Sequence, residues 1–243
     1  MADYHVIETS GLTMRFGGVT AVDHVDFALD DGELRCLLGP NGAGKSTFFK
    51  CLTGQLTPTE GSVTFKGQRV EGHQTHEIVN LGIGIKTQVP NLYDGLTAYE
   101  NVRLAARRKH LKKLAGEQAE KMLERCGVHD LAKRDVGLLS HGQRQLIELA
   151  MVLAAEPELV LLDEPAAGMT GEERDRLARL VKEISSHASV IVVEHDMQFI
   201  RQIAKLVTVF HRGQVFAEAP VDEIMRDPKV QEIYLGKAAD AAA

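Results

Sequence analysis

The chain has 243 residues and a formal net charge of −6. Apolar residues make up 44% and charged residues 26%, which is typical of a globular protein and excludes a disordered chain or a fibrous repeat. The negative charge gives no electrostatic reason to expect a nucleic-acid partner. This length predicts one large domain or two small ones, with a core that needs no disulfide or structural metal.

Two local features bear on the compartment. The apolar stretch at residues 146–155 is interrupted by Glu148 and is far shorter than the ~20 residues of a membrane span. Cys36, Cys51 and Cys126 are widely spaced and form no CxxC pair, which is typical of reduced thiols in a cytosolic protein. We therefore expect a chain that reaches a membrane only through a partner.

Short apolar segments separated by turn residues predict strands in the first part of the chain. These segments are residues 6–7, 19–22, 25–29, 34–38 and 62–65. The pattern changes after Gly44, where residues 45–53 predict a helix that Gly54 can end.

The middle of the chain, from about residue 97 to 155, is helical and charged, with no clear strand. Residues 100–108 and 117–125 have helix-forming composition. A basic run begins at the end of the first segment and consists of Arg107, Arg108, Lys109, Lys112 and Lys113. A solvated helix face is the favoured interpretation of this run, and contact with acidic headgroups beside a membrane partner is the alternative.

The last third alternates strands and helices. Residues 159–162 and 190–193 predict buried strands, and residues 206–210 with 214–217 predict a hairpin. The predicted helix at 170–187 carries apolar residues at helical spacing, namely Leu177, Leu180, Val181 and Ile184. Continuous aliphatic strands alternating with helices favour an α/β fold with a parallel sheet covered on both faces.

Residues 39–46, Gly-Pro-Asn-Gly-Ala-Gly-Lys-Ser, fit the pattern G-x-x-x-x-G-K-[ST] between a predicted strand and a predicted helix. The glycines let the backbone curl so that successive N–H groups face phosphate oxygens, and the helix adds its positive N-terminal end. Lys45 is expected to reach the β- and γ-phosphates, and the Ser46 hydroxyl to ligate Mg²⁺. The complete match in this context disfavours the alternative of a purely structural turn.

Two acidic residues, Asp163 and Glu164, follow the predicted strand at 159–162. Asp163 would hold Mg²⁺ directly or through water, and Glu164 beside it can polarise an attacking water. An isolated acidic pair is more often loop solvation, but with the phosphate-binding loop the pair predicts nucleotide hydrolysis.

Two further segments have a structural and a functional interpretation. Ser140 and Gln143 form a potential capping box, yet a glycine-containing helix start also binds a γ-phosphate. His195 follows the strand at 190–193, at the sheet edge where nucleotide sites gather, although a lone histidine is more often structural. Periodicity does not choose between these interpretations.

The phosphate-binding loop, Leu-Ser-His-Gly-Gln at 139–143, Leu-Leu-Asp-Glu-Pro at 161–165 and His195 occur in the order and spacing of an ABC transporter ATPase subunit. The chain resembles that family over nearly its whole length. The resemblance implies an α/β P-loop NTPase core of the ABC ATPase type at about 1–88 and 157–243, with N-terminal antiparallel β strands. It also implies an inserted helical signature subdomain at 89–156.

The resemblance also assigns roles to residues. Phe16 matches the aromatic residue that stacks on adenine, Gln88 the Q-loop glutamine and His195 the switch histidine. The implied catalytic residues are Glu164, His195, Gln88 and Lys45, and the implied metal ligands are Ser46, Gln88 and Asp163. The implied ATP-binding residues are Phe16, Gly39, Asn41, Gly42, Ala43, Gly44, Lys45, Ser46, Thr47, Ser140, Gly142 and Gln143.

The family resemblance implies partners as well. ATP would be held between the phosphate loop of one subunit and the signature helix of a second, in a head-to-tail homo- or heterodimer. The pair would bind membrane permease subunits at the cytoplasmic face of the inner membrane and act indirectly with a substrate-binding protein. Neither a second ATPase unit nor a long coiled coil is present, which favours transport over the alternative of a soluble ABC ATPase.

Several strings are similar to the ATPases of branched-chain amino acid and urea importers, namely residues 139–143 followed by Glu148, and residues 163–169, 193–197 and 233–236. His141, Met169 and the Tyr-Leu-Gly ending at 234–236 lean towards the urea branch, whereas Ile85 and Thr87 depart from it. We therefore expect branched-chain amino acids or related small amides, with urea as the alternative. Three positions differ from the commonest family residues: His141 replaces glycine, Phe16 replaces tyrosine, and Thr170 stands where many members have aspartate.

Overall fold

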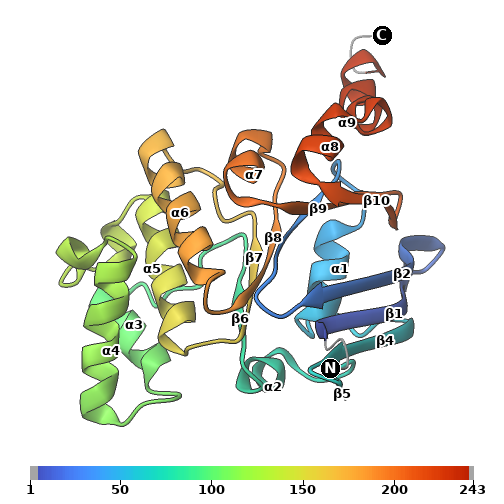
Figure 1. Ribbon diagram of the computed structural model, residues 1–243. Coiled ribbons are helices and arrows are strands. Elements are labelled where there is room, and N and C mark those ends of the chain that lie inside the picture. Colours follow the sequence, from blue (N-terminus) through green and yellow to red (C-terminus); the bar gives the residue numbers. More distant parts are fainter. Residues whose placement is uncertain (1–4, 241–243) are drawn as a thin grey trace.

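The computed structural model describes residues 5–240, which form two sheets with helices packed around them (Figure 1). The larger sheet consists of β3 (Leu34–Leu38), β6 (Ile83–Lys86), β7 (Leu159–Asp163), β8 (Ser189–Val193), β9 (Leu206–His211) and β10 (Gln214–Pro220). Its strand order is β10-β9-β3-β8-β7-β6, and β10 alone pairs antiparallel with its neighbour among these strands. The predicted parallel sheet and the C-terminal hairpin are confirmed.

Burial of the central strands explains their continuous aliphatic sequence. Every residue of β8 is buried, as are four of the five residues of β7. Because the strands are parallel, the loops that follow β3, β6, β7 and β8 leave the sheet at one edge. That edge carries residues 39–46, Gln88, Glu164 and His195.

The smaller sheet is antiparallel and consists of β1 (His5–Phe16), β2 (Val19–Asp30), β4 (Glu60–Phe65) and β5 (Gln68–Arg69). The predicted short strands at 6–7, 19–22 and 25–29 are wrong in length, because β1 continues to Phe16 and β2 joins two predicted pieces. Register shifts and the left-handed backbone of His24 (φ 49°) let the pairing continue through an irregular sequence.

The helices around these sheets are α1 (Lys45–Leu52), α2 (Thr75–Asn80), α6 (Gly171–Ile184), α7 (Met197–Ile203), α8 (Val221–Arg226) and α9 (Pro228–Asp240). Helix α6 buries the four apolar residues that its sequence predicts. It is shorter than the predicted 170–187, because Thr170 is its N-cap and the hydroxyls of Ser185 and Ser186 bond to backbone carbonyls just beyond its last turn.

Three helices from the middle of the chain pack on one another at the left of Figure 1: α3 (Ala98–Ala106), α4 (Lys112–Arg125) and α5 (His141–Ala154). Short 3₁₀ turns at His129–Leu131 and Val136–Leu138 join α4 to α5. Between residues 97 and 155 the described chain contains no strand, as predicted, and only one isolated bridge. The division into a core at 1–88 and 157–243 and a subdomain at 89–156 stays a prediction.

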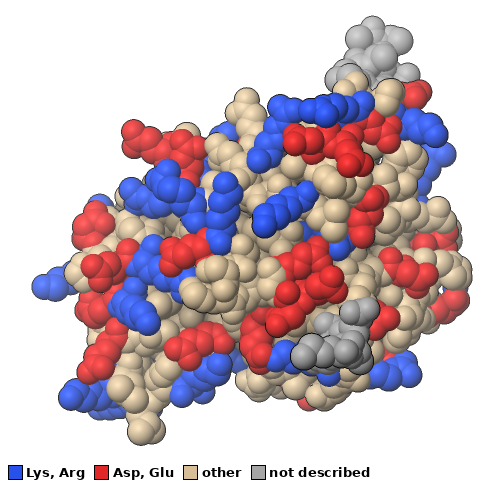
Figure 2. Space-filling view, viewed as in Figure 1, with Lys and Arg blue, Asp and Glu red and all other residues tan. Residues whose placement is uncertain are grey.

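The basic run at residues 107–113 is partly tied to the protein itself. Arg108 donates to the Asn80 side chain at 2.6 Å, and Lys109 donates to the Glu156 carbonyl at 2.9 Å. Positive and negative side chains are interspersed over the face shown in Figure 2. Residues 107–109 lie in the connection between α3 and α4, and only Lys112 and Lys113 are helical. All five basic residues are exposed, so the run is solvated, but the expectation of a single helix face is wrong.

The cysteines and the apolar segments also follow the sequence. Cys36, Cys51 and Cys126 are buried and free. Among residues 5–240, no helix combines the length and the apolar character that crossing a membrane requires.

Candidate functional site: a phosphate-binding loop and three strand ends

The loop between β3 and α1 can be built only with glycine at two of its positions. Gly39 has φ 155°, and a Cβ there would lie 2.4 Å from the carbonyl oxygen of Phe210. Gly44 has φ 103°, and a Cβ there would lie 2.4 Å from the carbonyl oxygen of Ala21. Close backbone approach from β9 and β2 therefore requires glycine and fixes the loop ahead of the helix N-terminus.

Lys45 folds back into this loop. Its ammonium donates to the carbonyls of Gly39 at 2.5 Å and Pro40 at 3.1 Å, and the side chain is buried. The hollow around it has a volume of about 240 Å³ and is lined by residues 41–47 together with Ala21 and Glu164. Ser46 is exposed at the start of α1. The structure thus brings the predicted phosphate ligands into one pocket beside the predicted catalytic carboxylate.

Phe16 lies at the end of β1, on the hairpin whose second strand contributes Ala21 to this pocket. Its side chain is 47% exposed. An exposed aromatic ring next to a phosphate-binding loop is available for stacking on a planar base.

The acidic pair at the end of β7 is electrostatically strained. Burial and the adjacent charge of Glu164 raise the pKa of Asp163 to about 6, although the cations of Lys86, Lys50 and Lys45 oppose the shift. Glu164 has a left-handed backbone (φ 43°), which is uncommon for a side chain of this size. Strained backbone of this kind clusters at functional sites, and here it directs Glu164 into the phosphate pocket.

Three predicted catalytic side chains meet at the strand ends. Gln88, after β6, donates its Nε2 hydrogen to Glu164 Oε2 at 2.8 Å. His195, after β8, places Nδ1 at 3.5 Å from Glu164 Oε1. The carboxylate of Glu164 is therefore held between an amide and an imidazole at the open edge of the sheet.

The predicted signature residues lie elsewhere. Ser140 caps α5 and forms the predicted capping box with Gln143, with bonds of 3.3 and 3.1 Å. A Cβ on Gly142 would lie 2.4 Å from Glu173 Oε2, so a larger residue there would have to displace the carboxylate that forms the capping box with Thr170. Within the described chain, the residues that line the phosphate pocket include none of 140–143.

The two departures near this helix have structural roles. The His141 ring packs against Gly168, where an added Cβ would lie 2.8 Å from Cδ2, and its Nε2 is 3.0 Å from Gln145 Nε2. Thr170 forms the predicted capping box of α6 with Glu173.

Sequence reasoning missed four buried polar residues beneath the site: Lys86, Gln145, Glu148 and Glu194. Glu194 is 1% exposed and accepts backbone N–H groups from Ala166, His195 and Asp196 at 2.9 to 3.2 Å. The available signal was a polar residue inside or next to an otherwise apolar segment, which is strand β6 for Lys86, the end of β8 for Glu194, and helix α5 for Gln145 and Glu148.

A parallel sheet with a phosphate-binding loop after β3 and an acidic pair after β7 defines a P-loop nucleotide-binding protein. Residues 22–167 match the family model "ABC transporter", and residues 214–240 match the model "Branched-chain amino acid ATP-binding cassette transporter". The chain belongs to the ABC transporter family of ATP-binding proteins.

Relatives agree over the full length. The chain is 35% identical to the high-affinity branched-chain amino acid transport ATP-binding protein BraF of Pseudomonas aeruginosa, over 96% of this chain and 98% of the relative. It is 33% identical to LivG of Escherichia coli K12, which has the same description and the same coverage.

Solved structures agree on the fold. A crystal structure of the ADP conformation of an ATP-binding cassette from an ABC transporter matches with a TM-score of 0.85 and 27% identity, covering 96% of this chain and 99% of that one. A dimeric cassette in a post-hydrolysis state with ADP and phosphate matches with a TM-score of 0.81 and 25% identity, covering 88% and 98%. The predicted ABC ATPase fold and ATPase activity are thereby confirmed.

Proposed function

We propose that this chain is the ATP-hydrolysing subunit of an importer for branched-chain amino acids or related small amides. The observation that carries the proposal is the match of residues 214–240 to the branched-chain amino acid model, combined with full-length similarity to BraF and LivG. Those relatives do not favour the alternatives, a urea importer and a soluble ABC ATPase.

Glu164 is proposed as the general base that orients and deprotonates the attacking water. Its place in the phosphate pocket and its contacts with Gln88 and His195 support this role. Lys45 would bind the β- and γ-phosphates, with Asn41 and Thr47 beside it, and Phe16 would stack on adenine.

Mg²⁺ is the proposed metal. A hydroxyl, a carboxylate and an amide oxygen suit a hard cation, and the raised pKa of Asp163 marks a carboxylate that a nearby cation would stabilise in its ionised form. Ser46, Asp163 and Gln88 would hold the ion, which supplies neutralisation of phosphate charge when bound.

A second ATPase subunit is proposed to complete the site. The phosphate pocket opens without any contribution from residues 140–143 of the same chain. In a head-to-tail pair, Ser140, Gly142 and Gln143 would present the N-terminal end of α5 to the partner's nucleotide. The pair would consist of two copies of this chain or of this chain and a related one.

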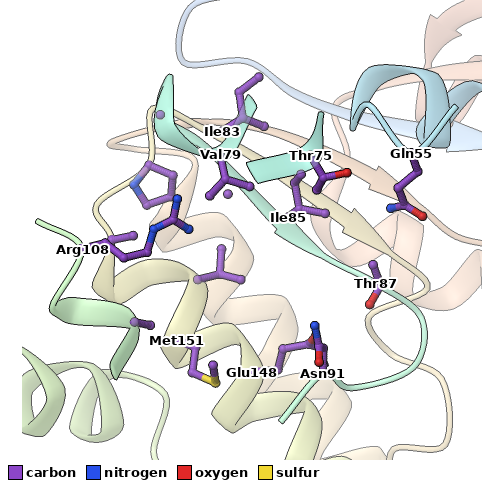
Figure 3. Close-up of a pocket in the computed structure, with 16 residues that line it drawn as sticks. Gln55, Thr75, Val79, Ile83, Ile85, Thr87, Asn91, Arg108, Glu148 and Met151 are labelled. Atoms are coloured by element: carbon purple, nitrogen blue, oxygen red, sulfur yellow. Dashed lines mark hydrogen bonds between the residues drawn. The ribbon is translucent and has the colours of Figure 1, made fainter. Parts of the chain in front are cut away.

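The permease is proposed to dock in a groove beside β6. This groove has a volume of about 490 Å³, and its residues come from α2, β6, α3 and α5 and from the loops next to them (Figure 3). Its wall combines apolar side chains such as Val79, Ile85 and Met151 with the guanidinium of Arg108. Tyr93 is exposed in the loop between β6 and α3. A permease partner would hold the chain peripherally at the cytoplasmic face of the inner membrane and would link it indirectly to a substrate-binding protein.

Uptake measurements test this function. Cells that lack the chain are compared with complemented cells for uptake of labelled leucine, urea and an unrelated sugar. Loss of leucine uptake alone, restored by the wild-type chain but not by Lys45→Ala, is expected. Loss of sugar uptake with leucine and urea unchanged would overturn the substrate class and leave the ATPase activity intact.

A further inference from the structure

Two side chains of α5 hold the loop that carries Gln88 at both of its ends. Gln145 Nε2 donates to the backbone carbonyl of Gln88 at 3.1 Å. One turn further along, Glu148 Oε1 accepts the backbone N–H of Asn91 at 2.9 Å. The backbone of residues 88–91 is thus held in place by two hydrogen bonds from side chains of α5.

A buried ion pair joins this helix to β6. Lys86 is fully buried two residues before Gln88, and its ammonium lies 3.5 Å from Glu148 Oε2. The ammonium also donates to the carbonyl of Thr87 at 3.3 Å. Burial lowers the pKa of Lys86 and raises that of Glu148, whereas each charge supports the other. Removing one partner would leave the other charge buried and uncompensated.

The pair lies where the groove meets the nucleotide site. Glu148 and Asn91 both line the groove and lie side by side in Figure 3. On the other side, Gln88 bonds to Glu164. A molecule bound in the groove that shifts α5 against β6 must therefore move both the Glu148–Asn91 contact and the Gln88–Glu164 contact.

We propose that Lys86 is a positioning residue that, through its ion pair with Glu148, fixes Gln88 against Glu164 and so links the groove to the ATPase site. The link to the groove rests on the proposed permease contact; the positioning of Gln88 does not. Lys86 acts through Gln88 and touches no substrate.

A double-mutant cycle on the purified full-length chain tests the proposal. Lys86→Met is expected to lower kcat by about tenfold, with the KM for ATP changed less than about twofold, because the contact it supports orients the base and not the nucleotide. In a Gln88→Ala background, the same substitution is expected to leave kcat unchanged within about twofold, because residues that act as a unit are not additive.

Charge removal from both partners supplies a rescue. Glu148→Gln keeps an oxygen that accepts the Asn91 N–H but removes the charge, so Lys86→Met with Glu148→Gln is expected to recover kcat to within about threefold of wild type. Arg35→Met is the matched control, because it removes another buried cation whose partners are Glu33 and Glu218. In the Arg35→Met background, Gln88→Ala is expected to lower kcat as much as it does in the wild-type chain.

Several outcomes would overturn the proposal. A loss of kcat from Lys86→Met that is equally large with and without Gln88 would make Lys86 merely structural, and so would a rise in KM without a fall in kcat. If Lys86→Met does not fold, Glu148→Gln takes its place in the cycle with the same expectations. All measurements use ATPase activity without a permease, so failure of the leucine uptake test leaves this result standing, and the reverse also holds.

Discussion

Glu194 and Ala166 join two loops of the nucleotide site: the buried Glu194 carboxylate accepts the Ala166 N–H at 3.1 Å. Ala166 follows Glu164 and Pro165 in the loop after β7, and the other oxygen of Glu194 accepts the N–H groups of His195 and Asp196 in the loop after β8. The Glu194 side chain therefore sets the distance between Glu164, the proposed base, and His195, which contacts it.

Glu194→Gln should loosen both loops. An amide group keeps one accepting oxygen and replaces the other with a donor, so at least one buried N–H loses its partner, at a cost of about 1–3 kcal/mol. We expect a lower free energy of unfolding, measured with urea, and a lower kcat. The exposed Glu172→Gln is the control, and equal stability of the two variants would contradict the role given to Glu194.

Glu164→Gln should keep ATP binding and nearly abolish turnover. The isosteric amide retains the shape of the side chain but cannot accept a proton, and removal of a general base costs about 10²–10⁴-fold in rate. The measurements are equilibrium binding of ATP and steady-state phosphate release. Near-normal phosphate release would show that another group activates the water.

The composite site predicts complementation between two inactive variants. Lys45→Ala damages the phosphate loop and Ser140→Arg places bulk and charge at the start of α5, while loss of the cap costs only about 1 kcal/mol of stability. In a mixed head-to-tail pair both defects fall in one site and the other site is intact, so mixing should restore ATPase activity.

A matched mixture controls for subunit exchange. In a mixture of Lys45→Ala and Glu164→Gln subunits, each composite site contains one defect, because both residues lie in the phosphate pocket of their own subunit. This mixture should therefore stay inactive. Activity in the second mixture, or none in the first, would refute the head-to-tail arrangement.

Asp163 predicts a pH-dependent stability. Its pKa is about 6 in the folded chain against an ordinary value of 3.8, so its ionised form costs folding stability, and this cost grows as the pH rises through that window and is complete above it. Asp163→Asn should therefore raise the thermal midpoint of the nucleotide-free chain at pH 8, with a gain that shrinks between pH 6 and about 4. Exposed Asp31→Asn is the control, and a gain of equal size at all pH values would contradict the assignment.

The phosphate loop and the acidic pair were predictable because each has fixed spacing and a strand before it. Strand β6 was not, since Gly84 and Lys86 interrupt its apolar pattern. Gly84 is required because a Cβ would lie 2.6 Å from Val152 Cγ1, and Lys86 is tolerated because Glu148 lies beside it. Val152 and Glu148 both belong to α5, which is distant from β6 in the sequence. Sequence patterns within β6 therefore cannot predict that these residues allow the strand.

Because its three native cysteines are buried, the folded chain can be labelled selectively at an introduced cysteine. Burial raises the pKa of Cys51 to about 11 and that of Cys126 to about 12, and it raises the pKa of Cys36 as well. Alkylating reagents attack the thiolate, so all three should react slowly while the chain is folded. A single cysteine introduced on the surface, for example at Leu138 in the turn before α5, can then carry a fluorophore or a cross-linker without removal of the natural ones.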